Sequence, residues 1–121
     1  MHGQAFFVYL LHCGDRSYYA GTTVDPMRRL AAHRRGRAAR YTRGRGPVRL
    51  AAVWWCPTRG AALRLEWLLK RMPHTAKRRL AGGAALVRII PKARALGVRR
   101  MNMLNMRNRS PVLRRYARME N

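Results

Sequence analysis

Hydrophobic and polar positions alternate along this chain in blocks that predict both strands and helices. A continuous apolar run over residues 5–12 predicts a central strand that is covered on both faces. Gly, Asp and Ser over residues 13–17 predict a turn, and residues 18–23 predict a second strand that returns antiparallel to the first. Residues 48–55 predict a third strand, which ends before Pro57.

Two amphipathic segments predict helices that flank this sheet. The first begins at Pro26, because Asp25 is a favoured N-cap and proline a favoured first helical residue, and it runs to about Arg35. The second follows Thr58, and its apolar positions recur at helical spacing. These positions are Ala61, Ala62, Leu65, Leu68, Leu69 and Met72. Residues 74–80 predict a further short helix.

Together these elements predict an α/β (α+β) fold, a small three-stranded antiparallel sheet flanked by helices. A chain of 121 residues is long enough for one modest core. The glycine pair at 82–83 marks a predicted boundary between a domain over residues 1–83 and a basic C-terminal extension over residues 84–121. Short amphipathic helices are predicted over 96–106 and 112–119. Whether the extension folds onto the domain or hangs free as a nucleic-acid-binding arm stays open.

The charge of the chain points to a polyanionic partner. There are 27 Lys and Arg residues and only 4 Asp and Glu residues, so the formal net charge is +23. Nucleic acid is the simplest such partner, because phosphate contacts release condensed counterions. A bias in base composition could also enrich arginine and alanine. A cationic membrane-active protein is the weaker alternative, because the charge is spread over the chain and not over one helix face.

The sequence favours an intracellular location, in the cytoplasm or nucleoid or, if the protein is viral, in the host nucleus. No uncharged run approaches the ~20 residues of a membrane-spanning helix, and the N-terminus does not have the pattern of a signal peptide. Cys13 and Cys56 make neither a metal quartet nor a disulfide framework. We expect both to be reduced, half-buried side chains.

Tyrosines in both hairpin strands are the first candidates for chemistry. If the turn holds an odd number of residues, Tyr9 lies opposite Gly21, and Tyr19 is diagonal to Tyr9 at roughly 7–8 Å. Gly21 would then leave bare backbone between two phenols, where a ligand could approach. A turn of two or four residues would instead put the tyrosines on opposite faces, and both could also be ordinary strand residues.

Basic residues follow the hairpin. Arg29 and His33 stand four residues apart and project from one face of the first helix. Spacing alone does not distinguish Arg29 from Arg28, because the helix could be a plain basic surface. In the loop over residues 37–47, Tyr41 could stack on a base or cover a phosphate.

Glu66 is the only acidic residue between Asp25 and Glu120, and it borders the apolar stripe of the second helix. One interpretation is an exposed ion pair with Lys70, worth only about 0.3–0.5 kcal/mol. The other is an oxygen ligand of Mg²⁺, which typically takes one or two protein carboxylates and keeps several waters. Composition does not separate the two.

Taken together, these segments resemble the GIY-YIG nucleases, in particular the small single-domain bacterial and viral members related to the nuclease domain of structure-specific endonucleases. Residues 7–9 (Phe-Val-Tyr) stand at the first motif of the family, and residues 19–21 (Tyr-Ala-Gly) stand at the second. The family's helix arginine and histidine fall on Arg29 and His33, eight and twelve residues after Gly21.

Two further segments extend the resemblance to roughly residues 6–82. Residues 40–44 (Arg-Tyr-Thr-Arg-Gly), with a Pro-Val pair after them, resemble the KYTRG…PV region of the small members. Glu66 matches the family's metal-binding glutamate. The sequence departs from the family in two places, because Phe7 replaces the glycine of the first motif and Ala20 replaces the isoleucine of the second.

The resemblance implies a divalent-metal-dependent endonuclease that hydrolyses DNA phosphodiester bonds, with a role in DNA repair or recombination. Glu66 would hold Mg²⁺ or Mn²⁺. Tyr9 would act as general base or position the attacking water, with Tyr19 in support. Arg29 would clamp the phosphate, and His33 would relay a proton or orient Tyr9 or water.

The implied partner is DNA, with no membrane and no small-molecule cofactor, and the oligomeric state stays open. Residues expected to contact the nucleic acid are Gly21, Arg28, Arg40, Tyr41 and Arg43. The alternative function is a catalytically inactive, basic nucleic-acid-binding protein of the same fold. Metal-dependent cleavage would distinguish the enzyme from the binding protein.

Overall fold

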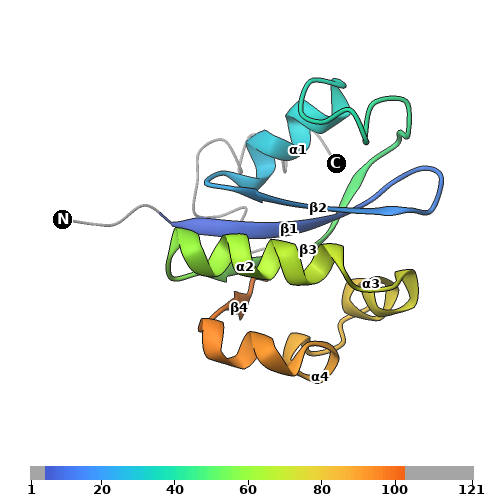
Figure 1. Cartoon of the computed structure of the whole chain (residues 1–121). Coiled ribbons are helices and arrows are strands. Elements are labelled where there is room, and N and C mark those ends of the chain that lie inside the picture. Colours follow the sequence, from blue (N-terminus) through green and yellow to red (C-terminus); the bar gives the residue numbers. More distant parts are fainter. Residues whose placement is uncertain (1–4, 103–121) are drawn as a thin grey trace.

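The computed structural model describes residues 5–102 and shows a four-stranded antiparallel sheet with helices on both faces (Figure 1). The strands are β1 (Phe6–His12), β2 (Tyr18–Thr23), β3 (Arg49–Cys56) and β4 (Arg99–Arg100), in the order β2-β1-β3-β4. The sheet and its flanking helices confirm the predicted fold class. The predicted count of three strands is wrong, because the chain returns after the last helix and adds β4 beside β3.

The helices begin where the capping residues predicted. α1 (Pro26–Arg34) is capped by the Asp25 side chain, which accepts a hydrogen bond from the Arg28 backbone N–H at 3.2 Å. α2 (Arg59–Lys70) is capped by Thr58, which accepts from the Ala61 N–H at 3.0 Å. The later helices are α3 (His74–Ala81), α4 (Leu86–Ile89) and the 3-10 helix η1 (Pro91–Leu96). Over residues 5–102, no helix is both long enough and apolar enough to span a membrane.

Each face of the sheet has its own apolar cluster. Val8 and Leu10 of β1 pack on the face covered by α2, α3 and α4, whereas Tyr9 and Leu11 pack on the face covered by α1 (Figure 1). This division follows from the alternation of side chains along a strand. β1 lies between β2 and β3, and a cluster covers each of its two faces, as its continuous apolar run predicted.

The described part of the C-terminal extension belongs to the same core. Buried side chains from α4, from η1 and from the residue between these two helices join the cluster under α2, and they are Leu86, Ala93 and Ile90. Residues 84–102 therefore fold onto the domain. The helix predicted over 96–106 is wrong up to residue 102, because Gly97 adopts the left-handed conformation (φ 67°) and the chain then enters β4. Residues 103–106 and the helix predicted over 112–119 lie outside the described residues.

The two cysteines lie in the core. Cys13 and Cys56 are free thiols, and both are fully buried where half-buried side chains were expected. Burial raises the pKa of the Cys56 thiol to about 11. Its side chain is therefore a protonated, small apolar group at neutral pH.

Candidate active site

The β1–β2 hairpin brings two tyrosines to the α1 face of the sheet. Its turn holds residues 13–17, an odd number, and Tyr9 pairs with Gly21 as the parity argument predicted. Tyr19 is the diagonal neighbour of Tyr9, with the two ring centroids 6.4 Å apart. A Cβ atom added to Gly21 would collide with the hydroxyl end of Tyr9. Gly21 is thus buried beneath Tyr9, which itself fills the space that was expected to admit a ligand.

A buried chain of hydrogen bonds joins Tyr9 to α1 and to the loop that follows it. The Tyr9 hydroxyl lies 2.8 Å from His33 Nε2, and His33 Nδ1 lies 2.7 Å from Thr42 Oγ1. The Thr42 hydroxyl donates its single proton to the Ala39 carbonyl at 3.3 Å, so it accepts from His33. This network assigns the proton of His33 to Nδ1 and leaves Nε2 to accept from Tyr9.

The surroundings keep both partners of this bond neutral. Burial and the positive charge of Arg29 together lower the pKa of His33 to about 4, and burial has the larger effect. Burial raises the pKa of Tyr9 above 10.0, an effect that the nearby Arg29 guanidinium offsets in part and that Tyr19 and Glu66 increase. At neutral pH the site therefore holds an intact phenol that faces a neutral imidazole.

The low pKa of His33 should make the fold sensitive to acid. His33 has a pKa near 6.5 when unfolded and about 4 when folded, so below pH 6.5 the unfolded chain binds a proton that the folded chain does not. The free energy of unfolding should fall as the pH drops from 6.5 to 4, by up to about 3 kcal/mol from this group. Urea unfolding at pH 7 and 4.5 measures the change, and a His33→Gln variant should show a smaller one. Equal losses in both proteins would contradict the assignment.

Arg29 lies half-buried beside the tyrosine–histidine pair. Its Nη2 donates to the Ala38 carbonyl at 3.4 Å, whereas its Nε is buried and, within the described residues, has no hydrogen-bond partner. An unpaired N–H of a buried guanidinium is costly, and such atoms in native proteins generally have a specific reason. A phosphate oxygen is the acceptor that a guanidinium fits best.

Tyr41 forms the outer wall of the site. Its ring stacks on Tyr19 with centroids 5.7 Å apart and planes 25° apart. The guanidinium carbon of Arg45 lies 4.2 Å from the Tyr41 centroid, and Arg45 is paired with Asp15 at 2.6 Å. The Gly14 N–H donates to the Arg45 carbonyl at 2.6 Å. These contacts hold the loop that carries Tyr41 against the hairpin turn.

Glu66 approaches the tyrosines from α2, which contacts the edge strand β2. The side chain is 22% exposed, and its Oε1 lies 3.7 Å from Lys70 Nζ. Its charge contributes to the raised pKa of Tyr9, so the carboxylate is within electrostatic range of that phenol. Lys70 Nζ lies 5.9 Å from the Tyr19 ring centroid. The predicted pair with Lys70 is present, and it borders the candidate site.

The possible metal ligands around the tyrosines suit a divalent cation that keeps most of its bound water molecules. Among residues 5–102, no three His, Cys, Asp or Glu side chains gather into a metal site, and Glu66 is the carboxylate whose charge raises the pKa of Tyr9. Mg²⁺ is commonly held by one or two carboxylates, with water and substrate phosphate as its other ligands. The Glu66 carboxylate fits that requirement, since its pair with Lys70 is long and partly exposed.

The arginines expected to contact nucleic acid lie at the periphery. Arg28, Arg40 and Arg43 are exposed, and Arg43 donates from Nε to the Gly36 carbonyl at 3.2 Å. None of the three joins the ring contacts and hydrogen bonds around Tyr9 that residues 5–102 make.

Thr42 was not among the predicted site residues. It is 2% exposed and fixes the tautomer of His33. Its sequence signal was its place within residues 40–44, which resemble a family segment, although nothing local distinguishes it from other loop threonines. A cavity of about 690 Å³ opens on this side of His33, and Arg35 and Arg43 are among the residues that line it.

Known proteins resemble this chain over the same elements. A family model described as the GIY-YIG catalytic domain matches residues 5–79. A UPF0213 protein of Halalkalibacterium halodurans is 45% identical over 74 residues, which are 61% of this chain and 79% of that protein. A UPF0213 protein of Vibrio cholerae is 40% identical over 85 residues, a match that covers 68% of this chain and 82% of the Vibrio protein.

A solved structure also matches. The match to the solution NMR structure of a UPF0213 protein from Bacillus halodurans covers 75% of this chain and 93% of the Bacillus chain, with 37% sequence identity and a TM-score of 0.43. The family model spans β1 to α3 and includes every residue of the site described above. The chain therefore belongs to the GIY-YIG family, and its relatives are the UPF0213 proteins.

Proposed function

We propose that this protein is a divalent-metal-dependent endonuclease that hydrolyses DNA phosphodiester bonds in repair or recombination. Membership of the GIY-YIG catalytic-domain family supports a nuclease. The observation that carries the proposal is the buried Tyr9–His33–Thr42 chain beside the unpaired Nε of Arg29. A scaffold needs neither a phenol that faces a histidine acceptor nor a buried guanidinium Nε that finds no acceptor among residues 5–102.

Tyr9 is the proposed base for the attacking water. Its proton passes to His33 Nε2, and the resulting phenolate removes a proton from water, whose oxygen attacks phosphorus as the bond to the leaving oxygen breaks. The leaving oxygen takes up a proton from solvent, and His33 releases its extra proton to solvent, which restores both side chains. In the free protein the raised pKa of Tyr9 and the lowered pKa of His33 oppose the first transfer. A phosphate bound to Arg29 would raise the pKa of His33 by offsetting that charge, and a cation held at Glu66 would lower the pKa of Tyr9, so the two together would favour the transfer.

Arg29 is the proposed phosphate clamp. Its Nε and one Nη can bind two phosphate oxygens as a fork, and the positive charge stabilises the transition state. Tyr41, which is 38% exposed and stacked on Tyr19, offers a ring edge and hydroxyl to the strand that enters. The exposed Arg40 and Arg43 would add affinity without reading sequence.

Glu66 is the proposed ligand of Mg²⁺ or Mn²⁺. When bound there, the cation would supply Lewis-acid polarisation of the phosphoryl oxygen and positive charge that favours the phenolate form of Tyr9. Lys70 would release the Glu66 carboxylate, which costs little because the pair is long and exposed.

Cleavage of DNA with and without metal tests the function. Purified protein with labelled branched, nicked and single-stranded DNA should give cleavage products with Mg²⁺ or Mn²⁺, none with excess EDTA, and products again when Mg²⁺ exceeds the chelator. A parallel set of RNA strands tests whether the activity is restricted to DNA. Tight binding without cleavage of any substrate would instead support the alternative, a basic nucleic-acid-binding protein that keeps the fold without the chemistry.

A further inference from the structure

A second basic surface lies on the face of the sheet opposite to Tyr9. The strand register aligns Tyr18, His12 and Arg49 in one row across β2, β1 and β3. Directly paired residues of antiparallel strands point to the same face. His12 follows Val8 and Leu10 in steps of two, so this row lies on the face that α2 and α3 cover.

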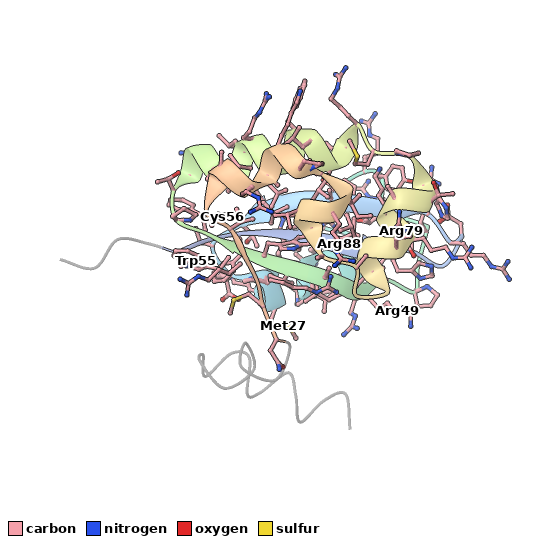
Figure 2. The ribbon with its side chains drawn as sticks, turned by 90° about the horizontal axis from the view of Figure 1, so that it is seen from below. Met27, Arg49, Trp55, Cys56, Arg79 and Arg88 are labelled. Atoms are coloured by element: carbon pink, nitrogen blue, oxygen red, sulfur yellow. The ribbon has the colours of Figure 1, made fainter. Side chains whose placement is uncertain are left out.

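An irregularity in the sheet turns Arg49 to this face. Leu10 pairs with Ala52, but the next residue, Leu11, pairs with Leu50, so β3 carries one extra residue at this point. An extra residue reverses the alternation of all side chains beyond it. Without the shift Arg49 would point toward α1. Figure 2 shows Arg49 at the end of β3 opposite to Trp55.

The hairpin turn and α3 complete a groove around this row. The Tyr18 ring lies between those of His12 and His74, with centroid distances of 5.1 and 5.2 Å. His74 Nε2 lies 2.9 Å from the Arg16 carbonyl and donates to it, which fixes the turn against α3. Arg78 is one helical turn beyond His74 and lies on the same side of α3.

Two cavities of about 210 and 310 Å³ adjoin here and share His12 and Tyr18 in their linings. We call this surface the far groove and define it by six of the residues that line these cavities. They are His12, Arg16, Tyr18, Arg49, His74 and Arg78. Its three arginines are all exposed.

Within residues 5–102, no acidic side chain neutralises the far groove. No carboxylate is among the described residues that line the two cavities. The acidic residue next in sequence to Arg16 is Asp15, and its carboxylate is already paired with Arg45 at 2.6 Å. The guanidinium groups of Arg16, Arg49 and Arg78 therefore remain available to an external anion.

We propose that the far groove binds the phosphate backbone of a nucleic acid strand. Exposed guanidinium groups that line adjoining cavities without a carboxylate match the charge of successive phosphates, whose oxygens they can bind. Tyr18 and Tyr19 are neighbours on β2, an edge strand, so the far groove and the candidate active site lie on opposite sides of a single strand. A nucleic acid strand that passes around this edge can contact both. The far groove does not depend on any chemistry at Tyr9.

Replacing two groove arginines tests the proposal. Full-length Arg49→Gln/Arg78→Gln protein is titrated with a fluorescent single-stranded oligonucleotide in EDTA at several salt concentrations, with fluorescence anisotropy as the readout. The dissociation constant should rise roughly tenfold near physiological salt. The negative slope of log affinity against log salt should become shallower by about 1.4, which is 0.7 for each lost phosphate contact. Since cleavage is not measured, a protein without nuclease activity would still give this result.

The matched control is Arg59→Gln/Arg94→Gln, which removes the same charge from exposed positions on α2 and η1. Its slope should stay at the wild-type value. Equal losses in the two double variants would overturn the proposal, because net charge alone would then set the affinity. Loss of binding to anionic lipid vesicles with unchanged oligonucleotide binding would overturn it as well.

Conservative variants show whether weaker binding comes from lost phosphate contacts or from a disturbed fold. Arg49→Lys/Arg78→Lys keeps both charges and should recover most of the salt slope, and circular dichroism should show wild-type thermal unfolding. If the double glutamine variant does not fold, Arg78→Gln alone, at an exposed helix position, should lower the slope by about 0.7. An unchanged slope in that single variant would contradict the proposal.

Discussion

Replacing Tyr9 by phenylalanine is expected to lower the rate of DNA cleavage by about 10²–10⁴-fold, the usual contribution of a general base. Phenylalanine keeps the ring that contacts Tyr19 and His33, so the shape of the site should persist. The substitution removes only the hydroxyl group, which donates a hydrogen bond to His33 Nε2. A buried acceptor then lies unpaired, and the free energy of unfolding should fall by about 1–3 kcal/mol.

Single-turnover cleavage at saturating DNA measures the rate, and urea unfolding measures the stability. Tyr18→Phe is the matched control, because it removes the same hydroxyl from the neighbouring residue on the opposite face of β2. Tyr18 lines the far groove, so its hydroxyl could affect DNA affinity, but at saturating DNA the variant should cleave near the wild-type rate. A Tyr9→Phe protein that cleaves as fast as wild type would show that another group activates the water.

Replacing Glu66 by glutamine is expected to lower cleavage by about 10²–10³-fold, the size of effect seen when an active site loses one electrostatic stabiliser of the transition state, which here would be the cation that Glu66 holds. DNA binding in EDTA should stay at or above the wild-type level, because the change removes a negative charge from a basic protein. The fold should be little affected, since the pair with Lys70 is long and partly exposed.

Cleavage rates measured over a range of Mg²⁺ concentrations distinguish a metal ligand from a general charge effect. The Glu66→Gln variant should need much more Mg²⁺ to reach half of its maximal rate. Asp25→Asn is the control, because it also removes one negative charge and asparagine caps a helix as well as aspartate does. An unchanged Mg²⁺ dependence in Glu66→Gln would rule out Glu66 as the ligand.

Local signals predicted most of the fold. Asp25 and Pro26 specify the start of α1 within one turn of chain, and the odd turn length fixes which residue lies opposite Tyr9. β4 was not predicted, because no local signal in the sequence marks it. It has two exposed residues, too few to show a period, and it forms only because the chain returns to pair with Trp54 and Trp55.

The candidate site was predictable as a set of residues but not as a network. Hairpin parity and the family resemblance brought Tyr9, Tyr19 and His33 together. That Tyr9 itself covers Gly21 depends on the direction of a side chain, which spacing does not encode. The bond from His33 to Thr42 joins a helix to a loop whose path is set by tertiary packing, so no local pattern could identify it.

The stack of Tyr19, Tyr41 and Arg45 has a consequence for how a ligand is received. The loop that carries Tyr41 is held to the hairpin turn at both the side chain and the carbonyl of Arg45. The conformational entropy of this loop is therefore lost when the chain folds and not again on association. Nucleic acid should therefore bind at Tyr41 almost as it would to a rigid surface. Diffusion and electrostatic attraction, and not closure of a lid, should limit the association rate.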